Sequence, residues 1–250
     1  MRDGLGTGDF THPVWRAELR DELVLDEKSG LYALKEPERA AQMLPEWADS
    51  ALLRDEVGKI RFMLQAEISS IYKRGGKTRK VHNLVYMPSL DAADAFSERL
   101  GQVGNLKSDG RPILGMDSRD ILDLTLNTDQ RAFLVPAHIW TPWFSLFGSK
   151  SGFDSLEECF GSLSGHIFAL ETGLSSDPEM NRRLSMLDGL KLISNSDAHS
   201  GENLAREANI FSGEISYQGI YDALRQPDSP ALSTHFIGTY EFFPDEGKYH

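Results

Sequence analysis

The chain has 250 residues, of which 40% are apolar and 26% are charged, as is ordinary for a globular protein. This length accommodates one large α/β domain or two small ones. The formal net charge of −12 argues against a broadly basic nucleic-acid-binding domain, although a local basic patch can still bind phosphates. The one cysteine, Cys159, excludes an internal disulfide and indicates a reducing, intracellular setting.

The sequence gives no sign of a membrane protein. No apolar run approaches the roughly 18 residues that span a bilayer. The first ten residues, MRDGLGTGDF, lack the apolar region of a signal peptide. We therefore expect a cytoplasmic protein without membrane contacts, and the oligomeric state stays open.

Short apolar runs alternate with amphipathic stretches along the chain. The apolar runs cover residues 60–66, 81–87, 132–136, 167–170 and 190–193. Helix starts are predicted between or after them at Ser89, at Ser118, at the pair Asp154 and Glu157, at Asp177 before Pro178, and at Ser216. This alternation predicts an α/β fold with mostly parallel strands.

Two stretches interrupt the alternation. Residues 141–154 are rich in glycine, serine and aromatic residues and are predicted to form a long loop. Residues 227–250 show little periodicity and are predicted to be irregular. We therefore expect one domain over residues 1–226, followed by an irregular C-terminal segment.

Carboxylate and imidazole residues fall near the ends of the apolar runs. Where parallel strands form a barrel, their carboxyl ends meet on one face. Such mixed ligands suit Zn²⁺, Mn²⁺ or Fe²⁺ better than Mg²⁺ alone, and paired metals support phosphoester hydrolysis. The residues that this pattern selects are Asp9, His12, Glu67, His82, His138, Glu171, Asp197 and His199.

A structural interpretation of the same residues stays open. Asp197 and His199 would face one way in an extended segment, but Asp197 would equally suit a turn or a helix cap. Glu67 and Glu171 would then be caps, and His82 a hydrogen-bonded histidine of the core.

A basic segment joins Glu67 to His82. Residues 69–84 are predicted to form a β-hairpin turning at Gly75 and Gly76. The segment is either a solvated turn or a clamp for DNA phosphates. Its basic residues are Lys73, Arg74, Lys77, Arg79 and Lys80.

Aromatic residues follow His138 directly, namely Trp140, Trp143, Phe144 and Phe147. Beside a metal site they could stack on an extruded base. They could equally form a small core beneath the long loop. We favour a DNA contact for Trp140, Trp143 and Phe144, because the loop starts at the rim of the predicted site.

Several motifs together resemble the polymerase-and-histidinol-phosphatase (PHP) superfamily, in particular its endonuclease Q branch. They are GTGDFTH, AEISSIY, KVHNLVYMPS, FLVPAHIWTPWFSLFGSKSGFDSLEECFG, IFALETGLSSDPEMNRRLS and LISNSDAHSGENLARE. The resemblance covers almost the whole chain. It implies a distorted seven-stranded β/α barrel with up to three metals, and cleavage of DNA beside deaminated bases or abasic sites.

The resemblance also implies roles for individual residues. Glu67, His82 and His138 would bind one metal, and Glu67 would bridge to a second that also uses Asp197. His12 and His199 would bind a third, with Asp9 orienting His12 or binding metal itself. Glu171 would support these ligands. Glu67, Asp197 and His199 would take part in catalysis, with Zn²⁺, Mn²⁺ or Mg²⁺ as the cofactor.

The chain departs from the family pattern at both ends. No His-x-His pair precedes GTGDFTH, as if the first strand of the barrel were missing, and the sequence stops at FFPDEGKYH, where the resemblance implies a following cysteine-bearing zinc module. We therefore expect an endonuclease-like protein that is weak or inactive as this fragment. A phosphatase of small phosphoesters and a non-catalytic DNA-binding remnant remain the alternatives.

Overall fold

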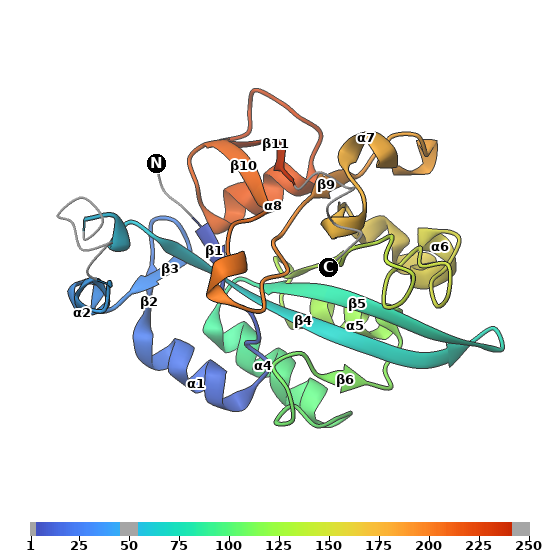
Figure 1. Ribbon diagram of the computed structural model, residues 1–250, viewed down its shortest axis with the longest axis horizontal. Helices are drawn as coiled ribbons and strands as arrows, with labels where there is room; N and C mark the ends of the chain where they lie inside the picture. The colour runs from blue at the N-terminus through green and yellow to red at the C-terminus, as the bar shows by residue number, and fades with distance from the viewer. Residues whose placement is uncertain (1–3, 46–54, 242–250) are drawn as a thin grey trace.

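The computed structural model describes residues 4–45 and 55–241, which form a mixed α/β structure. Figure 1 shows two long strands crossing the middle of the molecule, with helices on both sides of them. The strands are β1 (Gly4–Gly6), β2 (Leu23–Asp26), β3 (Leu31–Leu34), β4 (Arg61–Arg74), β5 (Lys77–Met87), β6 (Ile113–Leu114), β7 (Phe133–Pro136), β8 (Ala169–Glu171), β9 (Lys191–Ile193), β10 (Ala208–Gly213) and β11 (Thr234–Tyr240). The helices are α1 (Pro13–Glu22), α2 (Pro37–Gln42), α4 (Leu90–Gly101), α5 (Ser118–Thr128), α6 (Leu156–Phe160), α7 (Pro178–Asn181) and α8 (Tyr217–Arg225).

The hairpin of β4 and β5 is the longest regular feature of the fold. The two strands pair antiparallel from Leu64↔Met87 to Arg74↔Lys77. Gly75 and Gly76 turn the chain with φ values of 60° and 75°, which are left-handed and favour glycine. A two-residue turn of this kind matches the twist of the flanking strands. The hairpin predicted from the two glycines is confirmed.

The main sheet is mixed, and the expectation of mostly parallel strands is wrong for its centre. Within the described residues its hydrogen-bonded order is β2-β3-β4-β5-β7, with antiparallel pairing throughout this path. β1 and β6 pair parallel with successive parts of β4. The short turn after β4 explains the difference, because a parallel neighbour would need a crossover connection.

Two smaller sheets complete the strands that the structure describes. β8 and β9 pair parallel, and β10 and β11 pair antiparallel. No closed barrel forms among residues 4–45 and 55–241. The expectation of an irregular segment after residue 226 is wrong for β11, because this strand pairs with β10. Residues 242–250 lie outside the described residues.

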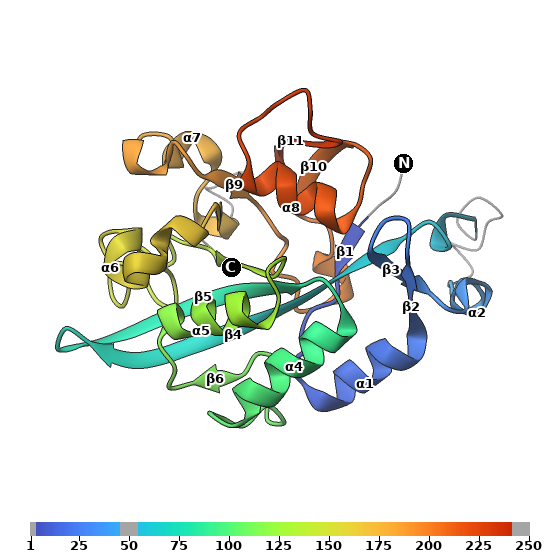
Figure 2. The same ribbon diagram turned by 180° about the vertical axis from the view of Figure 1, so that it is seen from behind.

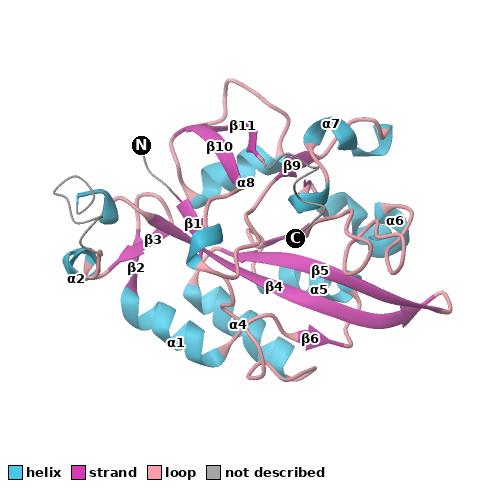
Figure 3. Ribbon diagram, in the orientation of Figure 1, coloured by secondary structure: helices cyan, strands magenta, loops and turns pink. Residues whose placement is uncertain are grey.

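Helices pack on the β4–β5 hairpin through apolar faces. Figure 2 shows α4 and α5 lying in front of these strands, with α1 beside α4. The face of α4 presents Leu90, Ala93, Phe96 and Leu100, all buried, as the sequence predicts. Phe96 meets Phe10 edge to face, with ring centroids 6.1 Å apart. A second buried cluster lies under α8, where Figure 3 shows the helix beside β9 and β10.

Capping residues begin most of the predicted helices. The starts at Ser89, Asp177 and Ser216 are confirmed, since each side chain accepts a hydrogen bond from a backbone N–H of the first turn. Two starts are wrong by one residue. Asp117 rather than Ser118 caps α5, and Ser155 rather than Asp154 caps α6.

None of the described helices is long and apolar enough to cross a membrane.

We predict that Phe96→Ala destabilises the fold by about 3–5 kcal/mol, because the fully buried ring leaves a cavity against Phe10. The free energy of unfolding from urea titration measures the effect. Val103→Ala is the control, since Val103 is 54% exposed and should shift the value by less than about 0.5 kcal/mol. A loss below about 1 kcal/mol for the Phe96 variant would contradict this packing.

Candidate metal centre

The pairing of three neighbouring strands brings Glu67, His82 and His138 together. Glu67 pairs with Leu84 across the β4–β5 hairpin, and His82 pairs with Ser69. Glu67 and His82 are therefore diagonal neighbours on one face of the sheet. Beyond β7, the N–H of Ala137 donates to the carbonyl of His82 at 3.0 Å, which places His138 next to His82.

The three side chains are in direct contact. His82 Nδ1 lies 2.6 Å from Glu67 Oε1 and 3.1 Å from His138 Nε2. The distance from His138 Nε2 to Glu67 Oε1 is 3.6 Å. A tetrahedral ion with bonds of about 2.0–2.1 Å separates its ligand atoms by about 3.4 Å. The distances of 3.1 and 3.6 Å are close to this separation. Glu67 Oε1 and His82 Nδ1, at 2.6 Å, would have to move apart by about 0.8 Å.

This donor set suits a divalent metal. One carboxylate and two imidazoles are ligands that Zn²⁺ and related ions accept, and three protein ligands leave a position for water. Glu67, His82 and His138 are also the one such group that the described residues form. The resemblance assigned these three residues to one metal, and the structure brings them together.

Burial and mutual contact set the ionisation of the cluster. Burial raises the pKa of Glu67, but hydrogen bonds from His138 and His82 outweigh it and hold that pKa below its usual value. Burial lowers the pKa of His82. For His138 burial also lowers the pKa, yet contacts with Glu67 and the charge of Glu171 produce a net rise. Glu67 is thus ionised and ready to bind a cation.

His138 is held by neighbours from several elements. Its φ of 27° is left-handed, and Gly173 packs directly against it. A methyl group on Gly173 would lie 2.7 Å from His138 Cα and closer still to its Cβ. Thr141 Oγ1 lies 3.1 Å from His138 Nδ1, leaving Nε2 to face Glu67 and His82.

Glu171 supports His138 from the end of β8. Its Oε2 accepts a hydrogen bond from the backbone N–H of His138 at 2.7 Å, and its Oε1 accepts one from Asn195 at 2.8 Å. Burial raises the pKa of Glu171 to about 7, and the charge of Asp197 adds to the rise. Glu171 therefore orients His138 rather than joining the ligand group.

Asp9 and His12 flank the cluster without joining it. Asp9 has a left-handed φ of 46°, and its carbonyl accepts from the N–H of His12. Burial raises the pKa of Asp9, and the charge of Glu67 adds to this, so the two carboxylates are neighbours. His12 caps α1 through Nδ1, which lies 3.5 Å from the N–H of Trp15.

Asp197 and His199 differ most from the sequence prediction. They follow β9 in a segment without regular structure, and the φ of Asp197 is 44°, so the expected extended conformation is wrong. His199 is 68% exposed, and its Nδ1 contacts the carbonyl of Asp197. The charge of Asp197 raises the pKa of both Glu171 and His138, which places Asp197 nearby.

The position of Glu67 also differs from the expectation. It lies in the middle of β4 and not at a strand end, and His82 lies in the middle of β5. Because β4 and β5 run in opposite directions, these positions coincide in space. His138, which follows β7, and Glu171, which ends β8, do lie at strand ends.

Two arginines of the basic hairpin hold the following loop. Arg79 is 7% exposed, donates to the carbonyl of Gly152, pairs with Glu158 at 3.0 Å and stacks over Phe153. Arg74 donates to the carbonyl of Cys159 and pairs with Asp117. The guanidinium groups of Arg74 and Arg79 are thus engaged within the protein, and their contact with DNA stays a prediction.

The lysines of the hairpin remain accessible. Lys73 and Lys77 are exposed, and Lys80 is half-buried. Lys80 Nζ lies 4.9 Å from the ring centre of Trp143 and 5.1 Å from that of Phe144. Lys80, Trp143 and Phe144 form a basic and aromatic surface beside His82.

The aromatic residues after His138 divide into two groups. Trp140 donates to Asn181 and packs on Phe147, and its DNA contact stays a prediction. Phe144 stacks against His82 with ring centroids 4.8 Å apart, and Trp143 is 49% exposed. The loop thus contributes partly to the core, as the alternative interpretation held.

One residue near the cluster carried no sequence signal. Arg111 precedes β6, and its Nη1 lies 3.4 Å from Glu67 Oε1 and 3.5 Å from Oε2. Only the parallel pairing of β6 with β4 brings it there.

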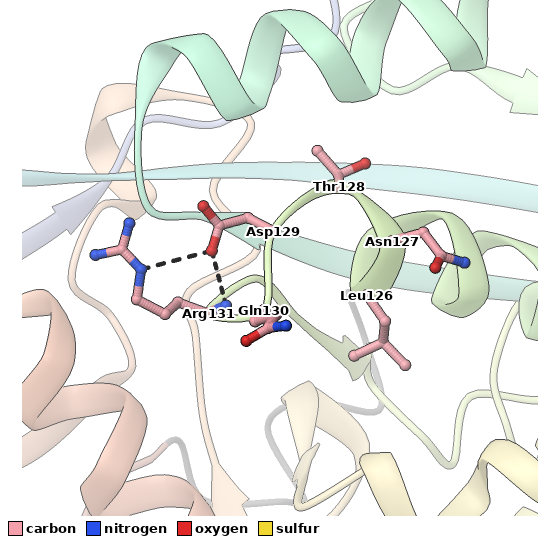
Figure 4. Close-up of a pocket in the computed structure, with 6 residues that line it drawn as sticks. All are labelled: Leu126, Asn127, Thr128, Asp129, Gln130 and Arg131. Carbon is pink, nitrogen blue, oxygen red and sulfur yellow. Dashed lines mark hydrogen bonds and ion pairs between the residues drawn. The ribbon is translucent and has the colours of Figure 1, made fainter.

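A surface hollow elsewhere has no part in this site. Residues 126–131 line it where α5 leads into β7, as Figure 4 shows. Asp129 there accepts from the backbone N–H of Arg131 at 2.8 Å and pairs with its side chain. These contacts are local, and none of the predicted site residues lines the hollow.

We predict that Gly173→Ala displaces His138 and lowers the free energy of unfolding by about 1–3 kcal/mol, since both a clash and a left-handed φ of 65° oppose the side chain. Shifted imidazole NMR signals of His138, compared with those of His166, report the displacement. Gly189→Ala is the control, because its added methyl group meets no atom within 4 Å. Unchanged His138 signals in the Gly173 variant would show that the glycine does not position the imidazole.

No protein-family model matches the chain. The uncharacterized protein YqxK of Bacillus subtilis is 33% identical over 176 residues, which make up 68% of this chain and 42% of that protein. The uncharacterized protein MJ0043 of Methanocaldococcus jannaschii is 37% identical over 114 residues, 44% of this chain and 14% of that protein. The chain thus spans less than half the length of these relatives.

Two solved structures resemble the whole described fold. The lesion-specific endonuclease PfuEndoQ of Pyrococcus furiosus superposes with a TM-score of 0.76 and 26% identity, covering 99% of this chain and 52% of that one. Endonuclease Q in complex with a 27-mer duplex carrying an abasic lesion gives a TM-score of 0.74 and 25% identity, covering 97% and 52%. The chain therefore has a fold like that of about half of endonuclease Q.

Proposed function

We propose that this protein is a metal-dependent endonuclease-like protein of the PHP superfamily that acts on DNA with a deaminated base or an abasic site. The cluster of Glu67, His82 and His138 carries the proposal, because it offers three metal ligands on a fold like that of a lesion-specific endonuclease. The structural neighbour bound to a duplex with an abasic lesion supports DNA as the substrate class.

Glu67, His82 and His138 would hold the metal, as Zn²⁺, Mn²⁺ or Mg²⁺. A divalent ion there would supply an activated water for phosphodiester hydrolysis. The chain itself keeps the ligand atoms in place. Glu171 and Gly173 fix the backbone of His138, and Thr141 occupies its Nδ1. Such outer contacts set ring orientation and basicity in metal sites.

Further ligands are proposed from the flanking residues. The charge of Asp197 acts on His138 and that of Glu67 on Asp9, so Asp197 and Asp9 are our proposed ligands of a second ion. His12 and His199 would have to turn further, because His12 caps α1 and His199 faces solvent. Glu67, Asp197 and His199 remain our proposed catalytic residues on this basis.

A barrel of the PHP type is proposed for the strands beyond the main sheet. The N–H of Ile139 donates to the carbonyl of Glu171, which links the end of β7 to β8. β8 then pairs with β9, so the strand path continues past the sheet edge. This continuation supports a distorted barrel built around the metal cluster.

The direct test is nuclease activity on duplexes carrying deoxyinosine or an abasic site, with Mn²⁺ or Mg²⁺. We expect at most slow cleavage at the lesion, as the departures from the family pattern imply, and a rate at least roughly 100-fold lower for Glu67→Gln, because even loss of an outer-sphere partner can cost that much. His166→Gln is the control, since His166 is exposed and outside the cluster. Metal content and p-nitrophenyl phosphate hydrolysis are measured in parallel.

The measurements of DNA cleavage, p-nitrophenyl phosphate hydrolysis and metal content distinguish the nuclease from the two alternative functions. Hydrolysis of p-nitrophenyl phosphate without DNA cleavage would indicate a phosphatase. DNA binding without metal or cleavage would indicate a non-catalytic remnant. Either result would overturn the proposed nuclease.

We predict that Lys77, at the turn of the β4–β5 hairpin, contacts a DNA phosphate. Lys77→Gln should lower the log–log salt slope of DNA binding by about 0.9, the value for one lost phosphate contact. Lys28→Gln is the control, because Lys28 lies in the β2–β3 turn, at the opposite end of the molecule in Figure 1. Equal slopes for the Lys77 variant and the unmodified protein would leave the hairpin as a solvated turn.

A further inference from the structure

We propose that Arg111 is a phosphate-binding residue of the candidate metal centre, placed to contact a backbone phosphate of the DNA beside the metal. This inference rests on the proposed function, and it adds a residue that neither the sequence motifs nor the metal cluster contains.

The backbone around Arg111 is fixed without help from its side chain. The N–H of Ser69 in β4 donates to the carbonyl of Pro112 at 3.0 Å, and β6 continues the pairing from Ile113. The N–H of Arg111 donates to Asp109 Oδ1 at 3.1 Å. The preceding Gly110 packs directly against the carboxylate of Asp9. The guanidinium is therefore not needed to hold this loop on the sheet.

The contact between Arg111 and Glu67 is long. Nη1 lies 3.4 and 3.5 Å from the two carboxylate oxygens, whereas charged pairs usually lie at about 2.7–2.9 Å. Glu67 is already bound closely by His82 at 2.6 Å. The other guanidinium nitrogens, which could donate further bonds, have no partner among the residues the structure describes. The group thus has donors available beside the cluster.

The access of Arg111 suits a ligand from solvent. Its side chain is 35% exposed, whereas Glu67 is 14% exposed. The guanidinium therefore reaches from the surface to the buried ligand cluster. A phosphodiester approaching the metal from solvent would meet Arg111 first.

The charges nearby indicate an anion between Arg111 and a bound metal. A divalent ion on Glu67 would lie close to the guanidinium, and two cations sharing one carboxylate repel each other. Asp9 and Asp109 reduce this repulsion, but Asp109 already accepts the backbone N–H of Arg111. A phosphate oxygen would bridge the two cations, and Arg is well matched to phosphate in geometry.

The proposal predicts opposite effects on the two ligands. Arg111→Gln should weaken binding of a fluorescent duplex with a tetrahydrofuran abasic site, measured in EDTA, and should lower its salt slope by about 0.9. The same variant should raise Zn²⁺ affinity by roughly 2- to 5-fold, because a repelling and competing cation is gone. Arg111→Lys should keep the salt slope of the unmodified protein.

Arg99→Gln is the matched control, since Arg99 is exposed on α4, and it should change neither affinity. If Arg111 had only a structural role, Arg111→Gln would lower the affinity for both DNA and Zn²⁺, and this result would overturn the inference. If the unmodified protein binds DNA and Zn²⁺ and Arg111→Gln leaves both dissociation constants unchanged, the inference about Arg111 is wrong, while the proposed function stands. An unmodified protein that binds neither ligand would overturn the proposed function and this inference together.

Discussion

The candidate site depends on the antiparallel pairing of β4 and β5. This register sets Glu67 diagonally opposite His82 on one face of the sheet, so the two side chains meet at 2.6 Å. A shift of one residue would turn one side chain to the other face and abolish the contact. β7 extends the sheet beside β5 and delivers His138, and β6 on the opposite edge of β4 delivers Arg111. Each added strand therefore supplies one more group to the same point.

The charges at this point explain why a cation is expected there. Glu67 is ionised, Asp9 lies beside it, and Asp197 lies beside His138. The negative charge of Glu67 is partly balanced by its contact with His138 and by the long contact with Arg111. Glu171 differs from Glu67 in its ionisation, since burial raises the pKa of Glu171 to about 7. It thereby acts as a hydrogen-bond acceptor for the His138 backbone instead of adding a fourth full charge at neutral pH.

Local chemistry made part of this structure predictable from the sequence. Gly75 and Gly76 fix the hairpin, and Ser89 begins α4, because turns and caps depend on neighbouring residues. The motifs also selected Glu67, His82 and His138 together. The burial of Arg79, the left-handed φ of Asp197 and the approach of Arg111 could not be predicted. Their partners come from distant parts of the chain, and only the tertiary register brings them into contact. The parallel-strand expectation failed for a related reason, since apolar runs carry no information about strand direction.

The most direct test of this account is anomalous diffraction from crystals grown with Zn²⁺, collected on both sides of the zinc absorption edge. The account predicts an anomalous peak at bonding distance from Glu67 Oε1, His82 Nδ1 and His138 Nε2. It also predicts that the first two of these atoms have moved apart to about 3.4 Å. A peak at other residues, or no peak at these three atoms under saturating Zn²⁺, would contradict the assignment of this cluster as the metal centre.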